Sequence, residues 1–507
     1  MKKNILKISV CLLVLLITYT ACNEENLTLQ PGVVTADNYF KSEADFRTAI
    51  IGAYSTLTDY YSSSNSGSGG QAESVIFYLP GDDLTINNTE AYEIFGSIGP
   101  NEGKLSSFYK SSYILVNRAN LILERLSAAD ASVFTTTTPI NVKKSVEGEA
   151  LFLRGFANYM LWNTFGTAPL TLKNVSDLAQ INNPSSKGTQ LLDQAITDFS
   201  AAAALLPNSW DSQNLGRVTA NSANGMLGKA LVFRATVNKA QVDYQAAIAA
   251  FSKISGVSLV ANFGDNFDYT KENGAESLFE FQSGGTINGL GTTNVWLSNT
   301  DANIGVASSY FASFDPGNFA NYMGGGVYTV TTKLVNSFNA GDPRAPQTYK
   351  IPTTNIAKYI LKSKMEGQNY LNNTVILRLA DVKLLWAEAL LASGNPGAAL
   401  QQINDVRTRA RNMATGGMIP VNFDASVTDR NTIFGWIMDE RLRELAAEGQ
   451  RWYDLRRWAL GGSISLNNAY FSSSNATNMK WDNKYLFFPI PQSELNLNPN
   501  IIQNPGY

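Results

Sequence analysis

The chain has 507 residues, a formal net charge of −3 and no histidine, and 11% of its residues are aromatic while only 16% are charged. The absence of histidine excludes a Ser-His-Asp triad, a Cys-His pair and a histidine metal ligand, which leaves an enzyme only paired carboxylates, Lys or Tyr chemistry, or a metal held by carboxylates. The mildly acidic balance argues against nucleic acid as a partner, and the many aromatic, Asn, Ser, Thr and Gly residues suit a neutral, hydroxylated ligand.

The first 21 residues form a predicted signal peptide. Lys2 and Lys3 precede the apolar run 8–17, which as a helix at about 1.5 Å per residue is about half as long as a hydrocarbon core is thick. The run is therefore too short to span a bilayer. A basic start, a short apolar run and the small residue Ala21 are typical of a secretory signal. No later stretch of the sequence is apolar enough to cross a membrane.

Cys22 stands at the end of this signal and is the only cysteine that remains once Cys11 is removed with it. A single thiol cannot form an internal disulfide, and without histidine it makes a poor metal site. The stretch "YTAC" resembles a bacterial lipobox, with Tyr19 where Leu is usual, which implies that Cys22 is a lipid anchor; ordinary cleavage near Ala21 is the alternative. The acids at 24–25 resemble the surface-export signal of Bacteroidota lipoproteins, which implies a body on the extracellular side of the outer membrane.

Apolar residues at three- and four-residue steps predict a mainly helical chain. The predicted helical stretches are 35–57, 106–126, 145–170, 187–209, 219–254, 377–411 and 431–461. The stretches 219–254 and 377–411 each resemble a tetratricopeptide unit, in which small residues let two antiparallel helices approach closely. Because the interval between the two is not a regular repeat, we predict a scaffold of packed helical hairpins rather than an open solenoid.

A loop-rich stretch at about 281–349 interrupts the helical pattern. It is rich in Gly, Asn, Ser and Thr, and large aromatic residues are embedded in it. Loops of this length inside a compact protein are uncommon and tend to carry function. A second stretch, 60–71, has the Ser- and Gly-rich composition of a flexible loop.

The segment "DERLRELAAEGQRWYDLRRW", 439–458, is dense in acids, arginines and aromatic residues. Glu444 and Glu448 offer a carboxylate pair of the kind that glycoside hydrolases use. Arginines three and four residues away share a helix face with such acids, however, and hold the pKa of a carboxyl group low, which is unsuited to a general acid. We therefore predict a structural ion-pair network, with Trp452 and Trp458 packed in the core, and no catalytic residue.

Long motifs in order along the chain resemble the SusD/RagB family of outer-membrane nutrient-binding lipoproteins. They are "PGVVTADNYFKSEADFRTAIIGAYSTL" and "EGEALFLRGFANYMLWNTFGTAPL" in the first half, "LVNSFNAGDPRAPQTY" in the middle, and "LRLADVKLLWAEAL", "ERLRELAAEGQRWYDLRRW" and "FPIPQSEL" towards the C-terminus. The resemblance covers nearly the whole chain after the signal. It implies a mainly α fold in which tetratricopeptide-like hairpins form a scaffold and an irregular, loop-rich region carries the ligand site.

The resemblance also implies a function. Members of the family capture nutrients, usually oligosaccharides, as lipid-anchored proteins of the outer membrane, and they sit on a SusC-like TonB-dependent transporter without catalysing a reaction. We therefore expect a protein that binds oligo- or polysaccharide and passes it to such a transporter. Two alternatives stay open: a binder of peptide or another nutrient in the same complex, and a secreted glycoside hydrolase that uses two carboxylates.

The motifs also imply an organisation of the chain. It consists of a lipoprotein signal peptide at 1–21, a tether at 22–36, an N-terminal SusD-like helical region with tetratricopeptide-like hairpins at 37–260, and a C-terminal SusD/RagB region at 261–507 with the loop-rich insert at about 281–349. In the family the ligand site is built from loops after the first helix and from the irregular middle segment. Here these two ligand regions are about 60–107 and 286–328.

Sugar sites combine aromatic faces, which stack on the apolar face of a pyranose, with Asn, Asp or Arg side chains that bind its hydroxyl groups. The two ligand regions supply the candidate glycan-binding residues Trp296, Tyr310, Tyr322, Tyr78, Asp82, Asp83, Asn87 and Asn299. For each aromatic residue the alternative is packing in the local core. The stretch 81–90, "GDDLTINNTE", also offers oxygen ligands for Ca²⁺, but it lacks the spacing of a known calcium-binding loop, so we expect neither a metal nor a cofactor.

Overall fold

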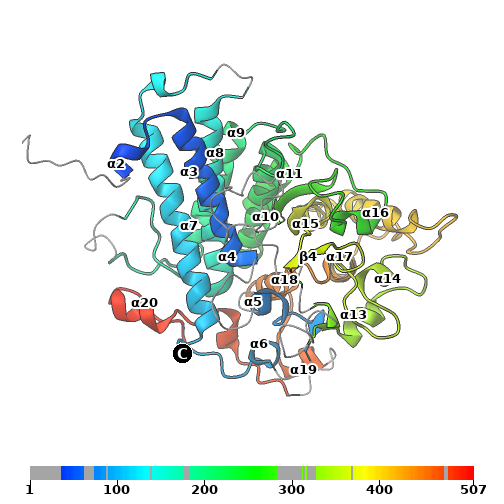
Figure 1. Cartoon of the computed structure of the whole chain (residues 1–507). Coiled ribbons are helices and arrows are strands. Elements are labelled where there is room, and N and C mark those ends of the chain that lie inside the picture. The colour runs from blue at the N-terminus through cyan, green and yellow to red at the C-terminus, as the bar shows by residue number, and fades with distance from the viewer. Residues whose placement is uncertain are drawn as a thin grey trace, which may run out of the picture.

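The computed structural model describes residues 36–61, 74–86, 90–136, 140–175, 182–283, 311, 314–316, 327–366, 369–472 and 478–507. Within this part of the chain the protein is mainly helical, with three short pairs of antiparallel strands (Figure 1). The shorter helices are α2 (Ala36–Tyr39), α4 (Thr58–Tyr61), α5 (Ser74–Tyr78), α6 (Ala91–Ile94), α13 (Thr332–Ser337), α14 (Ala345–Thr348), α18 (Arg451–Leu460), α19 (Asn468–Ser472) and α20 (Gln492–Leu497). No helix among these residues combines the length and the apolar character that crossing a bilayer requires.

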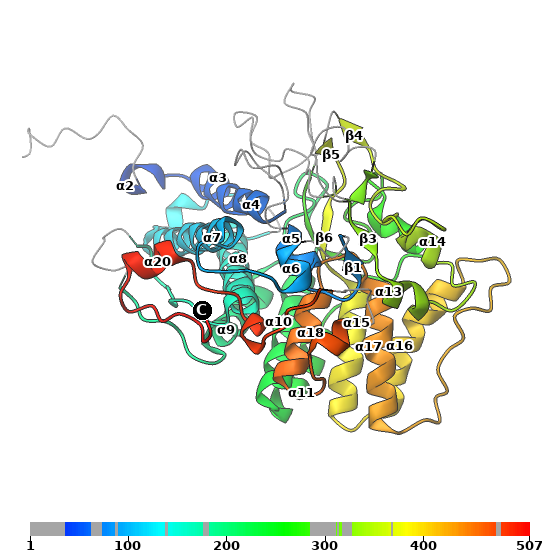
Figure 2. The ribbon, with the colours of Figure 1, turned by 90° about the horizontal axis from the view of Figure 1, so that it is seen from below.

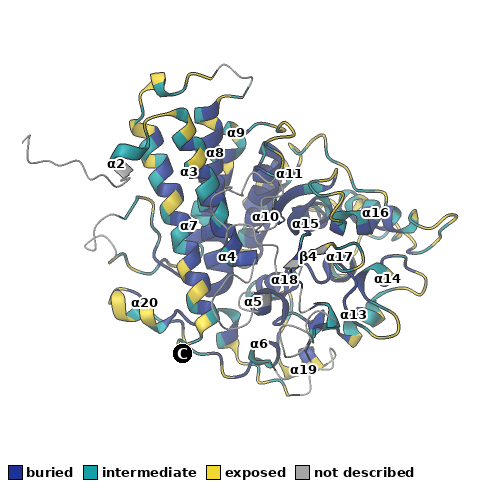
Figure 3. Cartoon of the chain, in the orientation of Figure 1, coloured by how far each residue is buried: buried dark blue, intermediate teal, exposed yellow. Residues whose placement is uncertain are grey.

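Four long helices from the first half of the chain pack against one another (Figure 1). They are α3 (Glu43–Tyr54), α7 (Gly103–Ala128), α8 (Val142–Phe165) and α9 (Gln190–Leu205). The predicted helix over 35–57 is broken at Ser42, because Ser42 and Asp45 form a capping box that starts α3. Most residues of α8 are buried, since α3, α7 and α9 all contact it (Figure 3).

Two helical hairpins continue the scaffold: α10 (Ala220–Asn238) with α11 (Gln241–Phe251), and α15 (Leu379–Ala392) with α16 (Pro396–Arg411). Helix α11 packs against α15, and α17 (Arg430–Leu445) packs against both α15 and α16 (Figure 2). These elements confirm the predicted tetratricopeptide-like hairpins. The second hairpin begins at Leu379, later than predicted, because Leu377 and Arg378 belong to strand β6 (Thr374–Arg378).

Gly228 sets how closely α10 and α11 approach. A Cβ atom at this position would lie 2.2 Å from Cε1 of Phe251, a fully buried ring on α11. Gly228→Ala is therefore expected to force the hairpin apart and to lower the free energy of unfolding by about 1–3 kcal/mol, measured by urea unfolding. Gly435→Ala within α17 is the matched control, since its added Cβ has no atom within 4 Å. An equal loss in both variants would contradict the packing argument.

One strand pair connects segments that lie on either side of the loop-rich stretch in the sequence. Strand β2 (Ser277–Phe281) runs antiparallel to β6, with Phe281 opposite Thr374. The ring of Phe279 in β2 contacts that of Phe152 in α8, with centroids 5.0 Å apart. The loop-rich stretch predicted from residue 281 therefore starts at the end of a buried strand.

One apolar core runs through both halves of the sequence, with buried residues from Phe46 to Ile501. Trp452 and Trp458 belong to it, as predicted. Figure 3 shows buried residues along α8 and α10, whereas α20 is largely exposed. The boundary at residue 260 stays a prediction, and the main core takes residues from both sides of it.

Candidate ligand-binding site

Asp82 lies in the turn between α5 and β1, where its side chain is fully buried. Arg451 donates from Nη2 to Oδ2 of Asp82 at 3.1 Å, Nζ of Lys333 lies 2.5 Å from the same oxygen, and the hydroxyl of Tyr470 lies 3.2 Å from it. Burial opposes ionisation of this carboxyl group, but the charges of Arg451 and Lys333 outweigh burial and hold the pKa of Asp82 well below its usual value. Asp82 thus ties together three segments at the base of the first ligand region.

Asp83 and Tyr78 are also buried. Oδ2 of Asp83 accepts a hydrogen bond from the backbone N–H of Ala447 at 3.1 Å. Burial, together with the charge of Asp82, raises the pKa of Asp83 to about 6. The ring of Tyr78 packs edge-on against Phe314, with centroids 5.3 Å apart. As placed, these side chains support the first ligand region from within, which for Tyr78 corresponds to the core-packing alternative.

Six buried aromatic residues connect the two predicted ligand regions, and we call them the aromatic layer: Tyr61, Tyr78, Phe281, Phe311, Phe314 and Tyr328. Tyr61, at the end of α4, stacks on Phe281, at the end of β2, with centroids 5.8 Å apart. Phe314 contacts both Tyr78, at 5.3 Å, and Tyr328, at 5.9 Å. Ligand regions that are far apart in the sequence therefore begin at neighbouring points of the fold.

Two further strand pairs fix the surroundings of the aromatic layer. Strand β1 (Leu84–Thr85) pairs with β3 (Thr329–Val330), which joins the first ligand region to the end of the second. Strand β4 (Met365–Glu366) pairs with β5 (Asn369–Tyr370). The hydroxyl of Tyr370 donates a hydrogen bond to Oδ2 of Asp315 at 2.7 Å, which ties this hairpin to the residue that follows Phe314.

Several predicted residues lie outside the described part of the chain: Cys22, Asn87, Trp296, Asn299, Tyr310 and Tyr322. Their roles stay predictions. The described residue next to Tyr310 is Phe311, whose ring stacks on that of Tyr359 with centroids 4.2 Å apart. This flank of the second ligand region is therefore anchored in the core.

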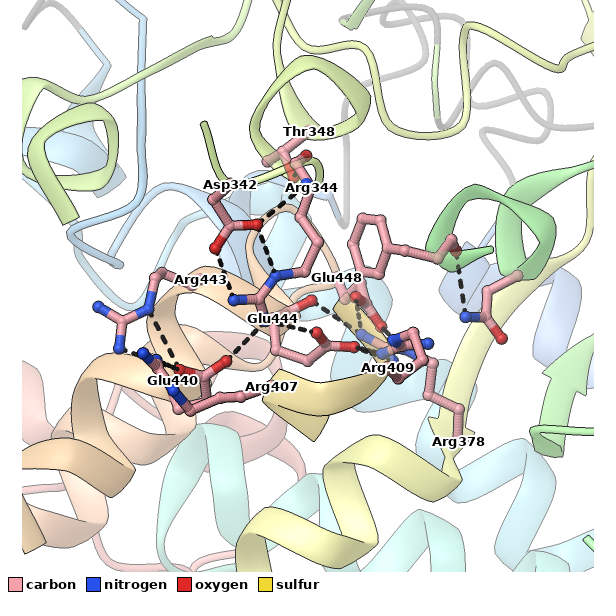
Figure 4. A network of polar contacts seen from close by, with 12 residues as sticks. Asp342, Arg344, Thr348, Arg378, Arg407, Arg409, Glu440, Arg443, Glu444 and Glu448 are labelled. Carbon is pink, nitrogen blue, oxygen red and sulfur yellow. Dashed lines mark hydrogen bonds and ion pairs between the residues drawn. The ribbon is translucent and has the colours of Figure 1, made fainter. Parts of the chain in front are cut away.

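A buried network of ion pairs occupies the place of the predicted carboxylate pair (Figure 4). Nη1 of Arg344 donates to Oε1 of Glu440 at 2.6 Å and to Oε2 of Glu444 at 2.9 Å. Nη1 of Arg378 donates to Oε1 of Glu444 at 2.7 Å, and Arg409 pairs with the same carboxylate. All five side chains are buried. Both carboxylates are therefore paired with buried arginines.

The arginines decide the ionisation of these acids. Burial opposes ionisation, but the positive charges hold the pKa of Glu444 well below its usual value and lower that of Glu440 to about 2. This confirms the predicted structural network. The predicted pairing on one helix face is confirmed for Glu440 with Arg443, at 3.0 Å, whereas Arg344 and Arg378 come from other elements. Arg378 was recognisable in the sequence as a lone charge in the apolar strand "TVILR", where a buried partner is required.

A second pair of acids consists of Glu272, in the segment before β2, and Glu280, within β2. The backbone N–H of Asn373 donates to Oε1 of Glu272 at 2.6 Å, and its Nδ2 donates to Oε2 of Glu280 at 2.9 Å. Burial and the neighbouring charge of Glu280 raise the pKa of Glu272 to about 9, so the pair retains a proton at neutral pH.

Within the residues that the structure describes, no three Asp, Glu, His or Cys side chains are grouped so that they could hold a metal ion.

Two family models match separate parts of this chain, and a relative aligns along nearly its whole length. A model of the SusD family matches residues 341–507, and a model described as starch-binding associating with outer membrane matches residues 35–232. SusD-like protein P2 of Formosa agariphila is 25% identical over 538 aligned residues, which cover 99% of this chain and 100% of that protein.

Solved structures show the same fold. A SusD superfamily protein from Bacteroides vulgatus superposes with a TM-score of 0.70 at 23% identity, over 93% of this chain and 100% of that one. A laminarin-binding SusD-like protein superposes with a TM-score of 0.66 at 22% identity, over 92% and 100%. Together with the two family models and the full-length relative, these matches identify the helical, tetratricopeptide-like architecture described above. The chain belongs to the SusD/RagB family.

Proposed function

We propose that the protein is a surface-exposed lipoprotein of the outer membrane that binds an oligo- or polysaccharide and passes it, uncleaved, to a SusC-like TonB-dependent transporter. The observation that carries this proposal is the aromatic layer, because it brings the starts of the two predicted ligand regions together on a helical scaffold. Family membership supports it, since one matching family model is described as starch-binding and a structurally similar relative binds laminarin.

Binding of a glycan without cleavage agrees with the burial and ionisation of the glutamate side chains. A glycoside hydrolase needs one protonated acid and one ionised carboxylate on either side of the scissile bond. Glu444, the first acid of the predicted pair, is buried and held ionised by arginines, so it is not suited to donate a proton. Glu448, the second, is buried and pairs with Arg378 and Lys358. Glu272 retains a proton, but its neighbour Glu280 is buried and accepts hydrogen bonds from Asn273 and Asn373. The carboxylate of Glu280 is therefore engaged in hydrogen bonds within the protein.

Membrane attachment and delivery complete the proposal. Lipidation of Cys22 would hold the body at the outer membrane, and stable attachment requires more than one acyl chain. The bound glycan would be released to the transporter partner without a bond being made or broken. Such a transfer requires neither a cofactor nor a metal.

Trp296→Ala is expected to weaken the binding of one polysaccharide from a panel that includes soluble starch and laminarin. The reason is that a stacked indole supplies much of the contact with a sugar ring, so its removal should weaken affinity about 10-fold or more. Retardation of the chain 23–507 in native gels detects binding, and calorimetry then measures affinity. Tyr269→Ala is the control, because Tyr269 is an aromatic residue with 39% exposure outside both ligand regions.

Three outcomes would count against this proposal. Unchanged affinity of the Trp296→Ala variant, with an unchanged melting temperature, would remove the stacking site from the second ligand region. Release of reducing sugar that survives repurification would favour the hydrolase alternative. A rise in melting temperature with peptides but not with any saccharide would favour a binder of another nutrient.

A further inference from the structure

A groove of about 570 Å³ lies between the loop that joins α9 to α10 and the segment that leads into β2. Its walls include Trp210, Arg217, Asn221, Ser255, Asn273 and Glu280. None of the described residues that line it belongs to the aromatic layer, so the groove is separate from the candidate site above. Its volume falls in the range of about 300–1,000 Å³ that small-molecule sites occupy.

Trp210 is held in a fixed orientation in this groove. Its Nε1–H donates a hydrogen bond to the carbonyl oxygen of Val218 at 2.9 Å. The guanidinium carbon of Arg217 lies 4.2 Å from the centre of the indole ring, which is a cation–π contact. The indole is half-buried. Its remaining surface is therefore presented in one orientation, and a ligand that stacks on it loses little of its binding energy to ordering the side chain.

Arg217 is itself fixed by buried partners. Its Nε donates to Oε1 of Glu149 at 2.7 Å, and the hydroxyl of Tyr54 donates to the same oxygen at 2.9 Å. Its Nη1 donates to Oδ1 of Asn214 at 2.7 Å. Because Glu149 balances the charge of Arg217, this cation supports the indole and does not attract an anionic ligand.

Beside Trp210 the groove offers neutral hydrogen-bonding groups, whereas the carboxylate of Glu280 in its wall is engaged with Asn273 and Asn373 and the amide of Asn273 pairs with Gln282. Asn208 and Ser209 line it next to Trp210 and are exposed. Ser255 and Asn273 come from the segment that leads into β2. A flat aromatic surface beside several amide and hydroxyl groups matches the two needs of a pyranose, whose ring hydrogens stack and whose hydroxyl groups require hydrogen bonds.

We propose that this groove is a second carbohydrate subsite, in which the exposed surface of Trp210 stacks on a pyranose ring while Asn208 and Ser209 bind its hydroxyl groups. The inference rests on the proposed function, since it takes the ligand of the protein to be a carbohydrate. A polysaccharide long enough to reach both places binds more tightly than a fragment that reaches only one, because the second contact is intramolecular.

Calorimetric titration of the chain 23–507 with maltohexaose and laminarihexaose tests the subsite. The wild type is expected to bind two molecules of the fragment that it recognises, whereas Trp210→Ala and Trp296→Ala each bind one. Two milder variants disturb the fold less. Trp210→Phe keeps an aromatic ring packed against Arg217, and Asn208→Ala leaves Trp210 and Arg217 unchanged. Each is expected to weaken one of the two binding events about 10-fold while the melting temperature stays unchanged.

The outcomes separate this inference from the proposed function. A single binding event whose affinity is the same in the wild type, Trp210→Ala and Asn208→Ala would overturn the subsite and leave the proposed function standing. Binding that survives in Trp296→Ala and disappears in the double variant with Trp210→Ala would support it. A wild-type chain that binds neither fragment, nor any polysaccharide of the panel, would overturn both.

Discussion

Glu444→Gln is expected to lower the free energy of unfolding by about 3–5 kcal/mol, because it removes one of the carboxylates that balance the charges of three buried arginines. Oε1 of Glu444 accepts a hydrogen bond from Arg378 at 2.7 Å, and Oε2 accepts one from Arg344 at 2.9 Å. All three side chains are buried. Glutamine keeps the size of the side chain and one acceptor oxygen, so the variant measures the loss of charge rather than the creation of a cavity.

Urea unfolding at pH 7, followed by circular dichroism, measures this effect. Glu124→Gln is the matched control, since Glu124 is exposed on α7, and it is expected to change the free energy of unfolding by less than about 0.5 kcal/mol. Equal stability of Glu444→Gln and the wild type would mean that the network contributes no net stability. A larger loss in the control than in Glu444→Gln would contradict the argument from burial.

The free energy of unfolding is also expected to fall as pH rises from about 5 to about 8, by up to about 1.4 kcal/mol per pH unit, because of Glu272. Burial and the charge of Glu280 raise the pKa of Glu272 from its ordinary value of 4.5 to about 9, and the charge of Asp268 adds to this rise. In this pH window the folded chain holds a proton that the unfolded chain has released. Each increase in pH therefore favours unfolding.

Glu272→Gln is expected to make this slope shallower, because glutamine keeps an acceptor for the backbone N–H of Asn373 but binds no proton. Urea midpoints at pH 5, 6, 7 and 8 for the wild type, Glu272→Gln and Glu124→Gln measure the slopes. The window ends near pH 8, since burial lowers the pKa of Lys358 to about 8 and its titration acts in the opposite direction above that pH. Parallel slopes in all three proteins would show that Glu272 is not the titrating group.

The helical scaffold could be predicted because its information is local. Apolar residues three and four apart define α8, α15 and α16, and the turn at Gly394 separates the last two, with a φ of 77° that suits glycine. The prediction places Leu377 and Arg378, the last two residues of strand β6, in a helix, because periodicity cannot distinguish a short apolar run in a strand from the start of a helix. Pairing with β2, far away in the sequence, decided its structure.

The candidate site was harder to predict, because its contacts are non-local. Asp82 and Asp83 follow Pro80-Gly81, a turn signal that normally marks the surface. Arg451 and Lys333 instead cover Asp82, and the backbone of Ala447 binds Asp83. The sequence indicated the aromatic and polar residue types of the site, but their neighbours come from α13, from the segment between α17 and α18, and from the start of α18.

The ion pair between Asp82 and Arg451 also constrains the order in which the segments of the protein fold. The two residues are 369 positions apart, and Asn163 and Arg456, which are hydrogen-bonded, are 293 apart. A chain that lacks α18 carries Asp82 without its main counter-charge, and burying an unpaired carboxylate costs several kcal/mol. The N-terminal half is therefore expected to complete its packing only once α18 has joined it.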